Sequence, residues 1–598
     1  MKDDYKDDYM CRGDWVAYMS GGSRVNPDED GRNIPFDLAF ALHSDAGMTS
    51  CDSTVGTLAI YTLKSEFKRK LPSGEDRRTS REYANLVQSQ IVRDIRHGYD
   101  TLWNRRFIWD RAYRESRTPT CPAMLCELLS HQNFADMKLG HDPGFKFTVS
   151  RAIYKGILKY LSNRYGCDYT VQPLPVNSFS ATFVNGRLRL KWRETPDMLE
   201  PTARPEGFIL QTRIDSEAFD SGKIIDARKT EDGTFWADID FDPGHIYSFR
   251  ITAFNSGGKS FPSETLSAGA PTLTWSGRKS VTDSCVLVVN NFNRVSGPAW
   301  FDYPEFAGFD SRLDSGVPYV RDISYTGQMY ENRRNAPWIS NDRPGFGASF
   351  NDCSGCIIAG NTFDYPAVHG RAILDAGYAF CSASAGAFSR DTTLTDGIWC
   401  MDLICGKQVT VASKGLKKAR FRVFPEELQT SIRRFTASGG NILVSGANIA
   451  TDIWDRVYPV AVDSSFRAAS ADFAGNVLGY GFISNYAGKT GEVTEVPGQT
   501  GMPGLQGAAM KFNNVPDEHL YCVEAPDGIA PANGHAQSVL RYEDTRVSAG
   551  ICADFGTYRT VCLGFPIEVL TEYDCIDRII KSSLQYFAKS TCNEQQGI

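Results

Sequence analysis

The first 168 residues alternate between short apolar runs and segments in which apolar side chains recur at helical spacing. The apolar runs cover residues 34–42, 55–63 and 122–129, and the segments with helical spacing cover residues 8–20, 81–95 and 145–164. Such alternation predicts strands separated by helices. We therefore expect residues 1–168 to form an α/β domain with a doubly wound sheet.

Residues 172–270 change to alternation with a period of two, as in Leu188-Arg189-Leu190-Lys191-Trp192. Prolines stand near both ends, and no cysteine occurs between Cys167 and Cys285. Alternation of this kind indicates strands with one buried face. The segment is therefore predicted to be a small β-sandwich that folds independently.

A second α/β pattern begins at the apolar run 284–290. Further strands are expected at 356–359, 379–383, 441–445 and 559–566, and helices at 366–377, 425–437 and 574–588. Between residues 470 and 553 the sequence is rich in glycine and resembles strands. The pattern predicts a flavodoxin-like α/β domain over residues 280–590, with an insertion near 470–553.

Composition limits the possible partners. The net charge of -7 over 598 residues gives no basic footprint for nucleic acid. No apolar run reaches the length of about 18 residues that a transmembrane helix needs. Met1 is followed by Lys-Asp-Asp-Tyr in place of an apolar signal core, so we expect no signal peptide in this chain. The sequence has the character of a chain cut at its start.

Two polar residues at predicted strands are candidates for chemistry. Glu127 interrupts an apolar run, and His43 follows the apolar run 34–42. If both strands belong to one sheet, His43 and Glu127 lie at the same edge. A carboxylate held in an apolar cleft has a raised pKa and can act as a general base. Alternatively, Glu127 faces water or pairs with one of the nearby arginines.

The stretches LAFALHSDAG, GTLAIYTL, SREYANLVQSQIVRDI and SRTPTCPAMLCELLSHQNFADM occur in this order. Together they resemble the later two thirds of a zinc-dependent N-acetylmuramoyl-L-alanine amidase domain. The resemblance implies that His43 binds zinc, that Glu127 is the catalytic acid/base, and that Asp45 and Arg117 contact the substrate. It also implies a zinc-bound water with a pKa of ~7, peptidoglycan or another glycan as partner, and a secreted, periplasmic or cell-surface location.

The sequence also departs from that family. Asp45 replaces an asparagine, and Leu128-Leu129 replace Gly-Phe. The family's first histidine and its ligand glutamate come from strands before the helix at residues 8–20, and those strands are absent. His131 and His141 lie in a polar loop, where solvated histidines are expected. We therefore predict that this chain binds little zinc and that the apolar run 36–42 lacks a neighbouring strand.

The other two regions carry their own resemblances. The segment YSFRITAFNSGGKSFPSE, with Trp192 in the core and Tyr247 as corner tyrosine, resembles a fibronectin type III domain. Residues 280–590 resemble a class I glutamine amidotransferase-like domain. That superfamily's nucleophilic cysteine is missing at Val444-Ser445-Gly446, where Ser445 is the alternative nucleophile. Asp364 is expected to be a helix cap.

Three functions follow as hypotheses. The first is a zinc amidase that cuts the bond between the glycan lactyl group and the first peptide residue of peptidoglycan. The second is a non-catalytic surface protein that only holds glycan. The third is a polysaccharide lyase, because Bacteroidetes proteins of similar three-part architecture often carry the name xanthan lyase. A lyase of that kind is expected to have arginine, tyrosine and histidine in a groove of a helical toroid, which this sequence does not predict.

Overall fold

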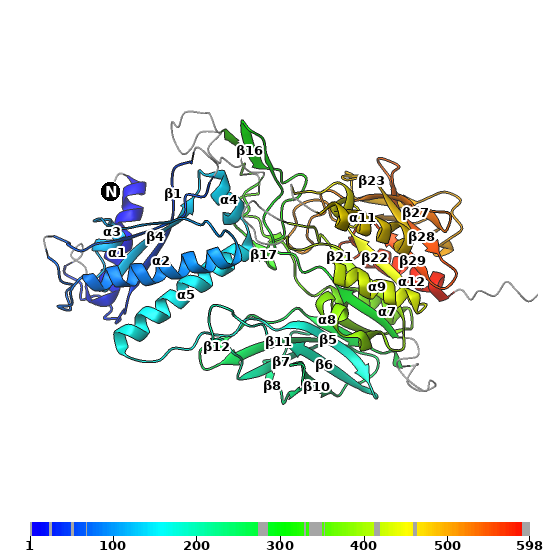
Figure 1. The fold of residues 1–598 in the computed structure, drawn as a ribbon, viewed down its shortest axis with the longest axis horizontal. Helices are drawn as coiled ribbons and strands as arrows, with labels where there is room; N and C mark the ends of the chain where they lie inside the picture. The colour runs from blue at the N-terminus through cyan, green and yellow to red at the C-terminus, as the bar shows by residue number, and fades with distance from the viewer. Residues whose placement is uncertain are drawn as a thin grey trace, which may run out of the picture.

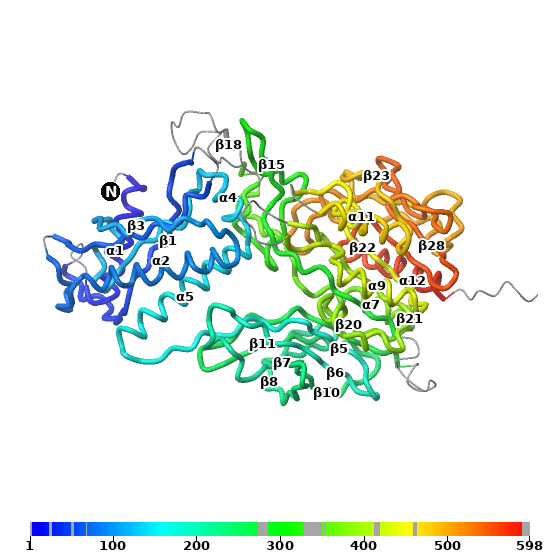
Figure 2. The backbone as a smooth tube through the Cα atoms, in the orientation of Figure 1, coloured from blue at the N-terminus to red at the C-terminus, as the bar shows by residue number. Residues whose placement is uncertain are grey.

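A computed structural model describes most of the chain and shows a mixed α/β protein, as the sequence predicts (Figure 1). The described residues are 3–22, 27–49, 53–66, 68–272, 285–327, 331–333, 350–351, 353–411, 419–458 and 463–588. The chain runs from the first region (residues 1–168) through a β-rich second region (172–270) to a large third region (280–590), and each region lies beside the other two (Figure 2). None of the described helices has the length and apolar character of a membrane span.

The first region contains a four-stranded sheet in the order β1-β4-β2-β3. Its strands are β1 (Ala39–Asp45), β2 (Thr57–Tyr61), β3 (Arg105–Asp110) and β4 (Ala123–Ser130). Its helices are α1 (Asp4–Gly21), α2 (Arg78–Gly98), α3 (Arg114–Arg117), α4 (Phe134–Gly140) and α5 (Pro143–Tyr165). Helices α2 and α5 pack against each other below the sheet in the view of Figure 1.

Local sequence explains this helix pair. Tyr83, Val87 and Ile91 recur at helical spacing on α2 and are fully buried. Helix α5 begins at Pro143, and the Asp142 carboxylate caps it by accepting the Phe145 N–H at 3.0 Å. Gly156 lets the helices approach closely, because a Cβ there would lie 2.7 Å from the Val87 Cα.

The sheet differs from the expected doubly wound arrangement in one respect. Strand β4 is parallel to β1 but antiparallel to β2, so the sheet is mixed. Within the described residues β1 is an edge strand, and its Leu42 is 54% exposed. Residues 39–42 of the apolar run 36–42 thus have β4 as a neighbouring strand, and the strands expected to be missing stay a prediction.

The second region consists of two small sheets that face each other, β5-β6-β10-β9 and β8-β7-β11-β13. The strands are β5 (Asn177–Val184), β6 (Arg187–Arg193), β7 (Gly207–Ile214), β8 (Lys223–Ile224), β9 (Arg228–Lys229), β10 (Phe235–Ile239), β11 (Ile246–Asn255), β12 (Gly258–Lys259) and β13 (Leu266–Gly269). Trp192 is fully buried between the sheets. The Tyr247 hydroxyl accepts the Asp242 N–H at 3.2 Å, as a corner tyrosine does.

The third region is built on five parallel strands in the order β20-β14-β21-β22-β29. Numbered along the chain this order is 2-1-3-4-5, the order of flavodoxin-like folds. These strands are β14 (Cys285–Asn290), β20 (Ala379–Ser384), β21 (Ile398–Gly406), β22 (Asn441–Gly446) and β29 (Arg559–Leu563). The helices are α7 (Tyr365–Asp375), α8 (Ala385–Arg390), α9 (Glu426–Ala437), α10 (Thr451–Trp454), α11 (Ser464–Phe473) and α12 (Tyr573–Ala588).

Additional strands extend this core. Between β22 and β29 the chain adds β23 (Tyr480–Ser484), β24 (Glu492–Glu495), β25 (Ala509–Lys511), β26 (Gly528–Pro531), β27 (Ala536–Tyr542) and β28 (Ser548–Asp554). Before α7 lie β15 (Trp300–Asp302), β16 (Phe306–Phe309), β17 (Arg321–Asp322), β18 (Glu331–Arg333) and β19 (Ile358–Ala359). Leu287 and Val288 illustrate how the central strand buries both faces, because they belong to two different apolar clusters.

The second and third regions share backbone pairing and one apolar core. Strand β5 pairs with β20 at Ala181 and Ser382, and the core around Trp192 continues into the face of the third sheet that α8 and α9 cover. An isolated segment 172–270 would therefore expose apolar surface that the third region covers. Its independent folding, like the boundaries of the three regions, stays a prediction.

Candidate functional site

His43 and Glu127 are neighbours on the first sheet. They occupy paired positions of the parallel strands β1 and β4, so their side chains leave the same face of the sheet. The alternate residues of β4, Met124 and Cys126, point to the other face and pack into the core under α2 and α5. The face that carries His43 and Glu127 is therefore the one away from these helices. The two residues meet as the sequence predicts, but within the strands and not at their ends.

A third residue, Glu115 on α3, completes this group. Its carboxylate accepts hydrogen bonds from His43 Nε2 at 3.0–3.1 Å and from Arg12 Nη1 of α1 at 2.9 Å. The hydrogen bond to Glu115 raises the pKa of His43 against the opposing effect of burial. Burial acts to raise the pKa of Glu115, but His43 and Arg12 outweigh it and lower that pKa. The contact between His43 and Glu115 is thus a hydrogen bond that becomes an ion pair when the imidazole is protonated.

Glu127 is half-buried and has an unusual environment. Its Oε2 atom is buried without a hydrogen-bond partner among the described residues. Burial raises the pKa of Glu127, Asp45 raises it further, and His43 and Arg106 oppose the shift. A carboxyl group with a raised pKa and an unpartnered oxygen is suited to accept or donate a proton. This is the chemistry that the sequence assigns to Glu127.

The described residues do not fit a hydrolytic zinc ion. Such a site needs three protein ligands and a water, and no cluster of three histidine, cysteine, aspartate or glutamate residues with metal-binding geometry occurs in the described part of the chain. A ligating histidine must also be neutral, whereas Glu115 occupies His43 Nε2 and favours the protonated ring. Zinc at His43 Nε2 would have to displace Glu115.

The two residues expected to contact substrate lie near this group. Asp45 ends β1, and its carboxylate accepts a hydrogen bond from Arg106 Nη1 at 2.6 Å. Arg117 is the last residue of α3, two positions after Glu115, and its carbonyl accepts a hydrogen bond from Arg77. Asp45 is therefore charge-compensated within the protein. No observation shows either residue contacting a ligand, so their role stays a prediction.

One of the two loop histidines differs from expectation. His131 Nδ1 lies 3.2 Å from the Ser44 hydroxyl at the end of β1. His141 packs its ring edge-on against Phe309 of the third region, with centroids 5.0 Å apart, and burial lowers its pKa to about 3. The expectation of a solvated loop histidine is therefore wrong for His141, because the third region covers it.

The third region contains two further residues with predicted roles, Ser445 as a nucleophile and Asp364 as a helix cap. Ser445 lies inside β22, is fully buried, and its hydroxyl has no hydrogen-bond partner among the described residues. A substrate cannot reach it there. Asp364 occupies the N-cap position of α7 but makes no capping hydrogen bond. Its expected capping role is wrong because Arg213 of the second region binds both carboxylate oxygens, at 2.6 and 2.8 Å.

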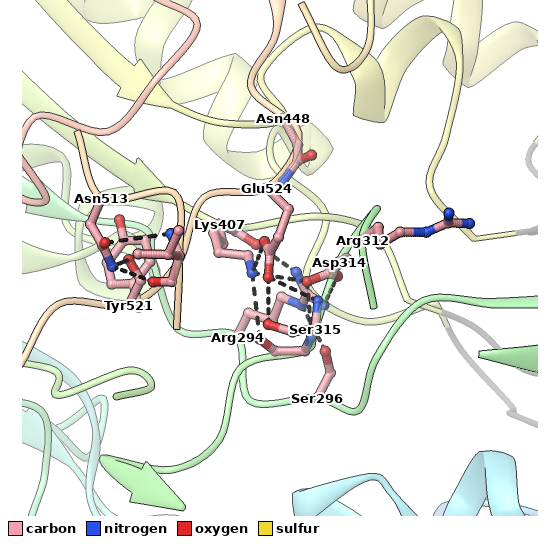
Figure 3. A network of polar contacts seen from close by, with 12 residues as sticks. Arg294, Ser296, Arg312, Asp314, Ser315, Lys407, Asn448, Asn513, Tyr521 and Glu524 are labelled. Carbon is pink, nitrogen blue, oxygen red and sulfur yellow. Dashed lines mark hydrogen bonds and ion pairs between the residues drawn. The ribbon is translucent and has the colours of Figure 1, made fainter. Parts of the chain in front are cut away.

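A buried ionic cluster lies beyond the carboxyl ends of β14 and β21 (Figure 3). Lys407 Nζ lies 3.0 Å from Asp314 and 2.6 Å from Glu524, and Arg294 is hydrogen-bonded to Asp314. All four side chains are at most 9% exposed. We call these four residues the Lys407 cluster. Because every member is paired and shielded from solvent, its role is structural.

Sequence reasoning missed Glu115 and Arg12. Glu115 lies only eight residues before Ala123, the first residue of the strand that carries Glu127. It nevertheless belongs to a charged stretch without apolar periodicity, Arg114-Glu115-Ser116-Arg117. Arg12 is more than one hundred residues away in sequence. The sequence offers no local signal that pairs them.

Replacing Glu127 with glutamine is expected to raise the free energy of unfolding at pH 7–8. The pKa of Glu127 is higher in the folded than in the unfolded protein, so folding is penalised once the pH exceeds both values. The gain should disappear near pH 4, where the carboxyl is protonated in both states. Urea unfolding at pH 4, 6 and 8 measures it, with the exposed Glu82→Gln on α2 as control. A stability loss at pH 8 would contradict the buried, unpaired carboxylate.

Comparisons with known proteins give weak structural similarities. No family model matches the sequence, and no curated protein matches it. The CwlD amidase from Clostridioides difficile, solved in complex with the GerS lipoprotein, is similar at a TM-score of 0.17 and 22% identity, over 22% of this chain and 57% of that chain. A β-galactosidase from Halorubrum lacusprofundi is similar at a TM-score of 0.24 and 14% identity, over 38% of this chain and 27% of its own.

An exo-β-1,4-mannosidase, Op5Man5 from Opitutaceae bacterium strain TAV5, is similar at a TM-score of 0.22 and 8% identity, over 37% of this chain and 29% of its own. The chain thus spans less than two thirds of each of these proteins. TM-scores below 0.5 do not establish a common fold for the compared chains. The similarity to an amidase structure is present and weak.

Proposed function

We propose that this protein binds peptidoglycan or a related cell-wall glycan on the face of the first sheet that carries His43, Glu115 and Glu127, and that it does not hydrolyse this glycan through zinc. The observation that carries the proposal is the 3.0 Å contact between His43 Nε2 and Glu115, which occupies one of the two ring nitrogens through which His43 could bind zinc. The resemblance of the first region to amidase domains supports the choice of glycan. A location outside the cytoplasm is part of the same proposal.

Binding without cleavage uses the groups that are present. Arg12 and His43 carry ring or guanidinium nitrogens, and Glu115 and Glu127 carry acceptor oxygens, on one half-buried face. Such a mixed set suits the amide, hydroxyl and carboxylate groups of a peptide-substituted glycan. Arg117 would add a further cation beside Glu115.

Zinc-dependent amide hydrolysis is the second candidate function. It is favoured by Glu127, whose raised pKa and buried, unpartnered oxygen suit a general base. It would need metal ligands beyond the described cluster. In that case Glu127→Gln would lower activity by about 10² or more while zinc stays bound.

One set of measurements separates the two candidates. Purified protein is incubated with peptidoglycan sacculi, and binding by co-sedimentation, zinc content by mass spectrometry and muropeptide release by chromatography are recorded together. We expect binding, substoichiometric zinc and no muropeptides. Arg117→Gln should weaken binding, whereas Arg105→Gln should not, because the Arg105 side chain reaches Asn85 on α2 at the opposite face. One zinc per chain with release that Glu127→Gln abolishes would establish the amidase instead, and absence of binding would overturn both.

A further inference from the structure

A large open cavity lies where the three regions meet. Its volume is about 1190 Å³, comparable to or above that of small-molecule sites, which run to ~1,000 Å³. Its walls come from the start of α5, from the ends of β5 and β6 and residues 261–265 of the second region, and from the segments that follow β14 and β20. We call it the junction pocket. It adjoins the carboxyl edge of the third sheet, where doubly wound folds place their ligands.

Four aromatic rings form a continuous row along this pocket. Phe147, Phe261, Tyr319 and Phe363 are neighbours in that order, with centroid distances of 5.8, 6.0 and 5.7 Å. The first region supplies Phe147, the second Phe261 and the third the other two. Phe147, Phe261 and Tyr319 remain 38%, 50% and 44% exposed. Contiguous exposed aromatic surface inside a cavity is costly in a protein without a ligand and marks a binding site.

The backbone of the pocket wall is strained. Ser178, Val320 and Phe363 line the pocket with φ angles of 50°, 58° and 57°. A left-handed conformation is a genuine outlier for the β-branched Val320, and each such residue costs on the order of 1–3 kcal/mol. Strained residues of this kind cluster at ligand-binding sites.

The polar groups of the pocket favour a hydroxyl-rich anion. Arg250 and Arg390 each donate one hydrogen bond to a neutral side chain, Gln211 and Ser178, and neither forms an ion pair with a carboxylate in the described part of the chain. Each guanidinium therefore keeps donors for a ligand. Seven neutral side chains add hydroxyl or amide groups: Asn177, Ser178, Ser263, Thr265, Asn293, Thr362 and Ser384.

The carboxyl group of Glu264 lies among these residues and accepts the Asn290 side-chain N–H at 2.7 Å. Burial raises the pKa of Glu264 to about 7, and the hydrogen bond from Asn290 opposes this shift. At neutral pH the group is thus partly protonated. It repels an anionic ligand less than an ordinary glutamate would.

We propose that the junction pocket binds an acidic oligosaccharide, with sugar rings stacked on Phe261 and Tyr319 and sugar carboxylates bound by Arg250 and Arg390. The apolar C–H face of a pyranose ring packs on an aromatic ring, and its hydroxyls need the surrounding donors and acceptors. The carboxylates match the two arginines. This site uses neither His43 nor Glu127, so the inference goes beyond the function proposed above and stands independently of it.

The test uses calorimetric titration of the whole chain with matched pairs of probes. The acidic probes are tetragalacturonate and a hyaluronan tetrasaccharide, and their neutral counterparts are maltotetraose and chitotetraose. At least one acidic probe should bind at least about tenfold more tightly than its neutral counterpart, and added salt should weaken that binding. Failure of both acidic probes to bind, or equal affinity for the neutral ones, would overturn the proposal.

Variants then locate the site. Phe261→Ala and Arg390→Gln are each expected to weaken binding about tenfold or more. Phe261→Ala removes a stacked ring, and Arg390→Gln removes a charge-assisted hydrogen bond. Phe107→Ala, at a ring on β3 that is 74% exposed, and Arg187→Gln are the matched controls and should leave affinity unchanged. Both pocket residues are at the surface, so thermal unfolding should show intact folds. Unchanged affinity of the pocket variants for the acidic probes would refute the location of the site. Sacculus binding by the same variants reports separately on the site proposed in the first region.

Discussion

Lys407→Met is expected to lower the free energy of unfolding by about 3–5 kcal/mol, because it leaves Glu524 and Asp314 buried without their shared cation. Burial acts to lower the pKa of Lys407, but Glu524 and Asp314 outweigh it and raise that pKa well above its usual value. The ammonium therefore stays charged in the core. Urea unfolding at pH 7, followed by tryptophan fluorescence, measures the loss.

The control for this prediction is an ion pair of similar chemistry at the surface. Arg187 lies 2.7 Å from Asp240, with side chains that are 51% and 91% exposed, so Arg187→Met should change stability by less than about 0.5 kcal/mol. Adding Glu524→Gln to Lys407→Met should restore at least about 1 kcal/mol, since one unpaired charge is removed. A loss below about 1 kcal/mol for Lys407→Met alone would show that water reaches the cluster.

His369→Gln is the second substitution with a large expected effect, a loss of about 3–5 kcal/mol at pH 6. His369 is fully buried, with Nδ1 2.7 Å from Asp402 and Nε2 3.4 Å from Glu568. Burial acts to lower its pKa, but the two carboxylates outweigh burial and raise the pKa to about 10. Glutamine can donate a hydrogen bond but cannot supply the positive charge.

The pH dependence identifies the charge. A histidine whose folded pKa of about 10 exceeds its unfolded value of ~6.5 contributes its full stabilisation below pH 6.5 and loses it as the pH rises toward 10. The difference between wild type and His369→Gln should therefore be largest at pH 6 and shrink by pH 9.5. His245 makes the same 2.7 Å contact, to Asp215, but its side chain is 51% exposed, so His245→Gln serves as control and should show no such trend. A constant difference across this range would mean that His369 is neutral in the fold.

Both predictions concern residues that sequence patterns did not single out for stability. Lys407 follows an apolar strand as an ordinary charged residue would, and its partners Asp314 and Glu524 are about one hundred residues away on either side. His369 stands on a helix whose apolar spacing gives no indication of two buried acids. Charges enter a core only when distant chain segments bring the opposite charge to the same point.

The sequence by itself determined the α/β class and the positions of most helices and strands. These features follow from the local spacing of apolar residues, which specifies a helix in α2 and α5 and a strand in β4. Cap residues such as Asp142 with Pro143 are local as well.

Only the tertiary structure decided the rest. The mixed direction of the first sheet depends on how β2 and β4 pair, which alternation cannot specify, because a strand buried on both faces has the same composition in either direction. The contact of His43 with Glu115, the capture of Asp364 by Arg213 and the aromatic row of the junction pocket each join residues from separate elements or regions. Their chemistry arises from contacts between segments far apart in the chain, and a one-dimensional pattern carries no information about such distances.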